Sequence, residues 1–299
     1  MREESLRVEV EGHLLHQLVL HPPVEIAVRA EAIFYHGQGD YAERYLDVLH
    51  PFTNRGIRCT ITELPGHGRS PGTRGHGGDA SLLDCVIGTV LAQIASRGNL
   101  PCGVMGHSMG GLLALRHLAL AGRGKFPVPA FAWLSSPLLN PGLGRPAFFI
   151  HLVRFLAPLL SSLSFSTRVK PEDCHAKPEG NDAVKLEQDD PVNPLKAELS
   201  HKRISMAWGV SLMDFAELVA EGAGEIPAAM PLLFTQGGED PVCPPELARK
   251  IFSRLPPGDK RYEELEGILH EPFRGDGSEL LYAVLDDWLD NTVLNQALK

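Results

Sequence analysis

Cysteine is scarce in this sequence: the 299 residues include five, an odd number, and no two form a Cys-x-x-Cys pair. Because unpaired thiols persist in reducing compartments, we expect a cytoplasmic protein that folds without disulfides. No group of cysteines and histidines has the spacing of metal ligands, so no metal site is expected. The five residues are Cys59, Cys85, Cys102, Cys174 and Cys243.

Excess positive charge and long apolar runs are also lacking. The formal net charge is −9 at pH 7, which argues against non-specific binding to nucleic acid. The first residues, Met1–Arg7, are mostly charged and contain no apolar core of the kind found in secretion signals. No apolar run reaches the length that we expect of a membrane span.

What the chain contains instead is an alternation of apolar strands and helices, which is typical of a mostly parallel α/β sheet. The alternation stops at about residue 138 and resumes at 228. We therefore predict one α/β core, formed by residues 1–137 and 228–299, with a cap insertion at 138–227. The expected strands are 6–11, 14–20, 32–35, 57–64, 101–105, 129–135, 231–235 and 260–265. The expected helices are 41–54, 81–96, 112–121, 201–219 and 278–294.

A Gly-x-Ser-x-Gly motif lies where the strand before residue 106 meets an apolar helical stretch. Its residues are Gly106, Ser108 and Gly110. A strand, a sharp turn and a helix are the context of a nucleophile elbow, in which a strained turn exposes the serine. Glycines two positions before and after it leave room for that turn. The alternative is a glycine-rich helix start with a capping serine.

Two further segments supply an acid and a base in the chain order Ser, Asp, His that this motif requires. Asp240 follows one apolar strand, and His270 follows the next. We predict that His270 is the general base and that Asp240 orients it, with Glu239 as the neighbour that could be mistaken for the acid. We expect His270 to titrate near its reference pKa of about 6.5. The thiol of Cys243, three residues after Asp240, should lie close to the catalytic centre, and an inert surface-loop thiol is the alternative. The segment after His270 is not a His-Glu-x-x-His zinc motif, because Arg274 replaces the second histidine.

The turn after the strand at 32–35 reads His-Gly-Gln-Gly. Such a turn can direct backbone N–H groups at a developing oxyanion. We predict that the N–H groups of Gln38 and Met109 form the oxyanion hole. An ordinary strand-to-helix turn is the alternative interpretation.

These segments together resemble the monoacylglycerol lipase and lysophospholipase branch of the α/β-hydrolases, which is grouped with the serine aminopeptidases. The resemblance implies an α/β-hydrolase fold: a mostly parallel central sheet flanked by helices, with a helical cap insertion. The sequence departs from the family at Glu63-Leu64-Pro65 and at residues 272–276. The matching segments begin at His36 (HGQGDYAERY), Gly66 (GHGRSPGTRGH), Gly106 (GHSMGG), Gly237 (GGED) and His270 (HE).

The resemblance implies a serine hydrolase that cleaves carboxylic esters, such as a monoacylglycerol or another short-to-medium acyl ester, with no cofactor. An aminopeptidase or amidase is one alternative, with Asp214, Glu217 and Glu221 as candidates to hold a substrate amine. A ligand-binding protein that retains the triad but turns over negligibly is another. The sequence does not indicate the oligomeric state.

The most apolar part of the insertion is residues 146–160. It is either core beneath the cap, or part of it lines an acyl channel or makes transient contact with a membrane or lipid surface. We predict that Phe149 and Leu152 line an acyl pocket.

Overall fold

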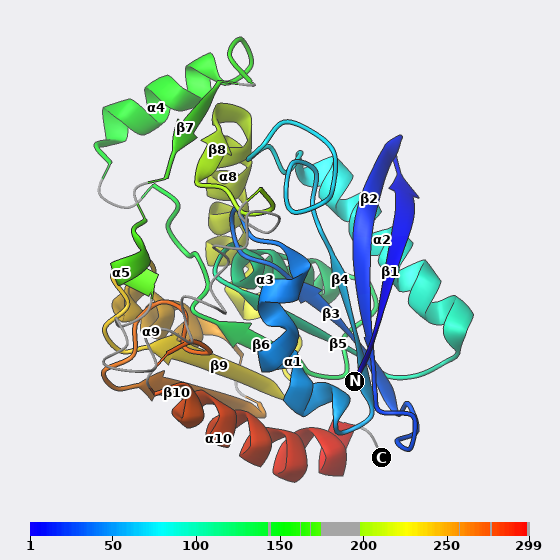
Figure 1. Cartoon of the computed structure of the whole chain (residues 1–299). Helices are drawn as coiled ribbons and strands as arrows, with labels where there is room; N and C mark the ends of the chain where they lie inside the picture. Colours follow the sequence, from blue (N-terminus) through cyan, green and yellow to red (C-terminus); the bar gives the residue numbers. More distant parts are fainter. Residues whose placement is uncertain are drawn as a thin grey trace, which may run out of the picture.

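The computed structural model describes residues 1–142, 145–161, 163–167, 169–174, 198–256, 258–275 and 277–297. Its centre is an eight-stranded sheet in the order β1-β2-β4-β3-β5-β6-β9-β10 (Figure 1). The first two strands are antiparallel, β2 is antiparallel to β4, and all other neighbours are parallel. The strands are β1 (Arg2–Val10), β2 (His13–His21), β3 (Ala30–Tyr35), β4 (Ile57–Thr62), β5 (Cys102–His107), β6 (Ala132–Ser135), β9 (Leu232–Gly237) and β10 (Lys260–Leu265).

Helices cover both faces of this sheet and create two buried apolar clusters. One cluster joins the sheet to α2, α3, α8 and α9, and the other joins it to α1, α10 and η3. The predicted core of a mostly parallel sheet between helices is therefore confirmed. The helices are η1 (Ala42–Tyr45), α1 (Leu46–Thr53), α2 (Ala80–Arg97), α3 (Met109–Gly122), α4 (Ala147–Leu156), α5 (Pro171–Cys174), α8 (Met206–Gly222), η2 (Ala223–Glu225), α9 (Pro245–Arg254), α10 (Ser278–Trp288) and η3 (Leu289–Ala297).

The central parallel strands are buried on both faces, which explains their largely apolar sequences. Their register brings the carboxyl ends to one edge: Tyr35 pairs with Gly106, and Ser135 pairs with both His107 and Thr235. Loops that leave this edge must start close together, and this is where open α/β sheets carry their sites.

One helix departs from the expectation that no segment could span a membrane. Helix α2 has 18 residues and a mean hydropathy of 1.2, which is long and apolar enough by length and composition alone. In the fold its apolar side, which includes Leu83, Val86, Ile87 and Val90, is buried in the core. The core helices of globular domains have the same composition, so this feature indicates packing against the sheet.

The cap boundaries at 138 and 227 stay a prediction, and residues 175–197 lie outside the described residues. The described part contains α4, α5, α8 and a separate antiparallel pair, β7 (Ser164–Ser166) and β8 (Arg203–Ser205). Figure 1 shows α4 and β7 beyond the strand ends and α8 running back toward α3. Helix α8 packs on α3, and its apolar side joins the sheet core.

The helix predicted at 201–219 begins later than expected, because β8 comes first. Its N-cap is Ser205, whose side chain accepts a hydrogen bond from the Trp208 N–H at 3.1 Å. Before this cap the chain is extended, because it bonds to neighbouring loops: His201 N donates to Gly39 O, and Ser205 N donates to Gly75 O, both at 2.9 Å. These contacts are distant in sequence and cannot be read from helical periodicity.

Candidate active site

Ser108 lies in a strained turn between β5 and α3. Its φ of 56° and ψ of −120° are unusual for a residue other than glycine. The flanking glycines are needed for space: a Cβ on Gly106 would lie 2.2 Å from the Gly110 carbonyl oxygen, and one on Gly110 would lie 1.8 Å from the Tyr35 oxygen. This is the strand–turn–helix geometry predicted for a nucleophile elbow.

The structure brings Ser108, His270 and Asp240 into one hydrogen-bonded relay, although they lie on three separate loops. His270 Nε2 is 2.8 Å from Ser108 Oγ, and His270 Nδ1 is 2.8 Å from Asp240 Oδ2. The carboxylate can only accept, so Nδ1 carries the proton and Nε2 is free to accept from the serine hydroxyl. Both Asp240 and His270 are buried, at 3% and 4% exposure.

The Asp240 carboxylate is fixed by its own loop. Oδ1 accepts from the N–H groups of Val242 and Cys243, each at 2.8 Å, and Oδ2 accepts from Gln236 Nε2 at 3.1 Å as well as from His270. The neighbouring acid, Glu239, is exposed. Asp240 is therefore the acid in contact with the histidine.

The environment of His270 favours its charged form. Burial alone disfavours that form, but the Cys243 sulfur and the Asp240 carboxylate outweigh burial, and the pKa of His270 lies well above 6.5. The sequence predicts a value near 6.5, so that expectation is corrected upward. The Cys243 sulfur lies within 4.8 Å of an Asp240 carboxylate oxygen and a His270 ring nitrogen, which confirms the predicted proximity of this thiol to the catalytic centre.

Gln38 and Met109, the predicted oxyanion donors, lie on adjoining segments, because the start of α3 packs against the end of β3. Within the described chain, neither N–H group donates a hydrogen bond to another residue. The peptide unit that carries the Gln38 N–H is fixed through its carbonyl, since Gly37 O accepts from His36 Nδ1 at 2.8 Å and from Asp40 N at 3.3 Å. A planar trans peptide held by its C=O directs its N–H the opposite way.

A second network, to which sequence reasoning assigned no role, connects the loop after β3 to the histidine loop. Tyr45 OH accepts from the Gly37 N–H at 2.7 Å and donates to Asp40 Oδ2 at 2.5 Å. Arg44 then contacts Asp40 at 2.9 Å and Glu271, the neighbour of the base, at 2.8 Å. These residues belong to the family-like segments that begin at His36 and His270, which was the only signal for them.

Two predicted substrate residues are not brought to the triad by any contact in the described part of the chain. Phe149 and Leu152 lie on α4 and are 38% and 47% exposed. Two of the three candidate amine-binding acids are engaged elsewhere: Asp214 and Glu217, on α8, contact Arg154 of α4 at 3.0 and 2.6 Å. Within the described part of the chain, these contacts do not bring either acid to Ser108.

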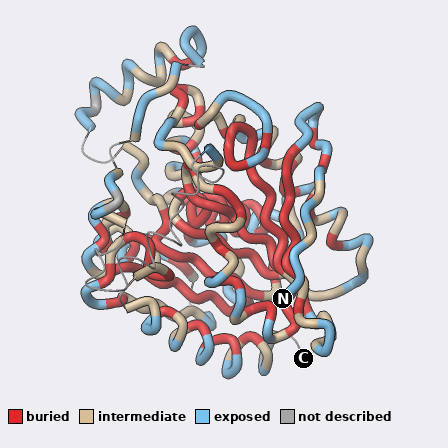
Figure 2. Tube along the Cα trace, in the orientation of Figure 1, coloured by how far each residue is buried: buried red, intermediate tan, exposed pale blue. Residues whose placement is uncertain are grey.

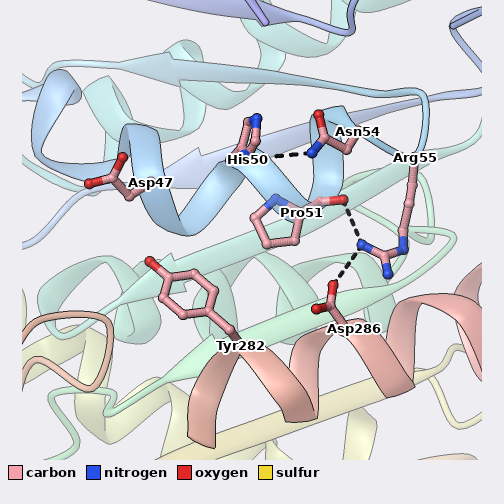
Figure 3. A pocket seen from close by; sticks show the side chains of 7 residues that line it. All are labelled: Asp47, His50, Pro51, Asn54, Arg55, Tyr282 and Asp286. Carbon is pink, nitrogen blue, oxygen red and sulfur yellow. Dashed lines mark hydrogen bonds and ion pairs between the residues drawn. The ribbon is translucent and has the colours of Figure 1, made fainter. Parts of the chain in front are cut away.

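A surface cavity of about 390 Å³ lies between α1 and α10, and no triad residue lines it. Its arginine is already paired, because Arg55 contacts Asp286 at 2.7 Å (Figure 3). Arg55 also bonds Asp290. The lining residues are Asp47, His50, Pro51, Asn54, Arg55, Tyr282 and Asp286.

The potential ligand atoms of Asp240, Cys243 and His270 lie within 4.8 Å of one another, the one such group of three among the described residues. Both ring nitrogens of His270 are already engaged, with Asp240 and Ser108. The arrangement therefore matches a proton relay better than a resident metal site.

Comparison with known proteins agrees with this geometry. A family model described as serine aminopeptidase, S33, matches residues 26–276. The chain is 25% identical over 263 residues to a monoacylglycerol lipase of Mycolicibacterium smegmatis, covering 87% of this chain and 88% of that protein. It is 26% identical over 269 residues to an uncharacterized abhydrolase domain-containing protein of Dictyostelium discoideum, covering 89% of this chain but 27% of that longer protein.

A solved structure of a monoacylglycerol lipase is also similar to this chain. The crystal structure of Paleococcus ferrophilus monoacylglycerol lipase has a TM-score of 0.76 and 28% identity, covering 93% of this chain and 98% of that one. Its fold and the family match confirm the resemblance drawn from the sequence segments. The chain therefore belongs to the serine aminopeptidase S33 family of α/β-hydrolases and is a monoacylglycerol lipase-like hydrolase.

Proposed function

We propose that this protein hydrolyses carboxylic esters through an acyl-enzyme formed on Ser108. The observation that carries the proposal is the buried relay with 2.8 Å between Ser108 and His270 and 2.8 Å between His270 and Asp240. A serine hydroxyl is a weak nucleophile, and this arrangement supplies the base and the orienting acid that it needs.

The first half of the reaction forms the acyl-enzyme. Ser108 Oγ attacks the ester carbonyl while its proton passes to His270 Nε2. Asp240 stabilises the resulting imidazolium, and the N–H groups of Gln38 and Met109 stabilise the oxyanion. Collapse of this intermediate expels the alcohol, which takes the proton from His270. Water then repeats the sequence on the acyl-enzyme and releases the carboxylic acid.

The substrate class that we propose is a monoacylglycerol-like ester with an aliphatic acyl chain. Relatives named monoacylglycerol lipase support this class. Helix α4 supports it independently, because large apolar side chains remain exposed there, including Phe148 at 72% and Phe155 at 75%. Such a surface suits transient contact with lipid and an acyl pocket that includes Phe149 and Leu152.

The test compares p-nitrophenyl esters of rising acyl length with aminoacyl amides, together with labelling of the enzyme by a fluorophosphonate. We expect ester turnover, weak or no amide turnover, and a single labelled residue, Ser108. Amide turnover faster than ester turnover would make the protein an amidase, and a single binding event without turnover would make it a ligand-binding protein.

A further inference from the structure

The side chain of Gln38, whose backbone carries a proposed oxyanion donor, is held by the cap rather than by the core. Its Nε2 donates to the Arg203 carbonyl oxygen at 2.8 Å, and its Oε1 accepts from the Trp208 indole Nε1 at 2.9 Å. Arg203 lies on β8 and Trp208 in the first turn of α8. Both polar ends of one amide are thus fixed by the segment that closes the cap insertion.

Trp208 is itself rigidly placed. Its indole is fully buried and stands at an angle to the Phe215 ring, with centroids 5.9 Å apart. A Cβ on Gly77 would lie 2.6 Å from this indole, so the loop after β4 closes directly on it. The backbone of Trp208 is held by the Ser205 hydroxyl, which in turn contacts His76 Nδ1 at 2.8 Å.

The backbone of the same turn is also fixed from the cap. The Gly39 carbonyl accepts from the His201 N–H at 2.9 Å, and a Cβ on Gly39 would lie 1.9 Å from the His201 carbonyl oxygen. Three consecutive residues of this turn are therefore supported: the core holds the Gly37 carbonyl, and the cap holds the Gln38 side chain and the Gly39 carbonyl.

We infer that Trp208 is a positioning residue for the oxyanion hole, so that the docked cap completes the catalytic site. An N–H donor stabilises an oxyanion only when its direction is fixed before the reaction, because reorientation during the reaction costs free energy. Without the indole bond, the Gln38 amide keeps only its bond to the Arg203 carbonyl, so its side chain is held at one end and the direction of its backbone N–H is less firmly fixed. This inference rests on the proposed ester hydrolysis.

The decisive variant is Trp208→Phe, which removes the indole N–H and keeps an aromatic ring against Gly77. We expect kcat to fall about tenfold, less than the roughly 10²–10³-fold effect of losing a whole oxyanion donor, while KM changes less than twofold. The matched control is Trp133→Phe. It removes another fully buried indole bond, to Thr235 Oγ1 at 3.1 Å, in the sheet core, and should lower the melting temperature without a specific loss of kcat.

A readout specific to the oxyanion is the affinity for an alkyl trifluoromethyl ketone. Ser108 Oγ bonds to its carbonyl carbon, the carbonyl π pair moves to oxygen, and the serine proton passes to His270. We expect the affinity for this ketone to fall in parallel with kcat/KM in Trp208→Phe. A kcat loss with unchanged ketone affinity would overturn the inference, since it would indicate a merely structural role.

A double-variant cycle supplies the second measurement. Gln38→Met cannot form either side-chain bond, so adding Trp208→Phe to it should lower kcat no further; multiplied losses would overturn the inference. If Trp208→Phe does not fold, the test rests on Gln38→Met alone. A native kcat together with a native ketone affinity in Gln38→Met would then refute the inference. If the wild type neither hydrolyses esters nor binds the ketone, the proposed function itself has failed.

Discussion

The edge of the sheet formed by the carboxyl ends of the strands and the cap helix α4 differ in how far their side chains are buried. At the sheet edge, Asp240 and His270 are nearly inaccessible, and each polar atom of the Asp240 carboxylate has protein donors. On α4, Phe148 and Phe155 are 72% and 75% exposed, and Figure 2 shows this helix in the colours of exposed and intermediate residues. From this difference we predict a division of roles, in which the core performs the chemistry and the cap selects the substrate.

The sharpest test of this division is removal of the nucleophile. Ser108→Ala should lower kcat by roughly 10⁶-fold, because only binding and the oxyanion hole remain. The fold should persist, since the hydroxyl is not needed to form the elbow. Ester hydrolysis and circular dichroism check this, with the exposed Ser253→Ala as control. Near-native turnover in Ser108→Ala would remove the serine-hydrolase interpretation.

The second largest effect concerns the two neighbouring acids. Asp240→Asn should cost about 10⁴-fold in kcat, because an amide can favour the wrong tautomer of His270. Glu239→Gln should change kcat less than twofold, because Glu239 is exposed and Asp240 is the acid that bonds to the histidine. Steady-state kinetics of the matched pair decide the assignment. Equal losses would mean that the core does not fix the acid as the geometry indicates.

The core motifs were predictable because each one is local. The nucleophile elbow can be recognised from six consecutive residues, and its strand and helix directly adjoin it. The order Ser, Asp, His along the chain, together with strand-end positions, was enough to select Ser108, Asp240 and His270, and the structure brings these three into contact.

The remaining features depend on pairings that no local pattern encodes. The Gln38–Trp208 bond joins residues 170 positions apart, and the Arg44–Glu271 pair joins residues 227 apart. Cys243 is an intermediate case: its distance of three residues from Asp240 predicted proximity to the site, but not its burial or its effect on His270. The sequence left the exposure of α4 open, because an apolar run has the same sequence whether it is covered or not.

Chemical modification of Cys243 offers a way to inhibit catalysis without modifying a triad residue. Alkylation should reduce activity by at least about 100-fold, because a buried thiol beside Ser108 and His270 leaves no room for an adduct and a substrate. Burial raises the pKa of this thiol, so labelling should be slow at neutral pH and faster above it. Mass spectrometry measures the rate and extent of labelling, and an ester-hydrolysis assay measures the residual activity.

The control for this experiment is Cys243→Ala, judged against its own starting activity. Its activity should resist the reagent, and an active-site ketone bound beforehand should protect the wild type. Full activity after quantitative labelling of Cys243 would contradict the placement of this sulfur.

The pH profile tests the electrostatics of the core. Only neutral imidazole accepts the Ser108 proton, so kcat/KM should rise with pH through the pKa of His270 in the free enzyme. Because Asp240 and Cys243 raise that pKa, the midpoint should lie above 6.5, with about a tenfold loss per pH unit below it. A midpoint at or below 6.5 would show that burial outweighs the two neighbours.

The smallest effects are expected on the cap, and they decide whether α4 selects the substrate. Each methylene buried against Phe149 or Leu152 contributes up to about 0.8 kcal/mol, so kcat/KM should rise up to about fourfold per methylene until the pocket is full. Phe149→Ser or Leu152→Ser should flatten this rise and leave acetate esters nearly unchanged, because the exposed helix lies outside the hydrogen-bonded relay. The matched control is Leu280→Ser, an exposed leucine on α10, which should alter neither slope. Equal losses for acetate and long-chain esters would instead make α4 a structural element, and the division between a catalytic core and a selective cap would fail.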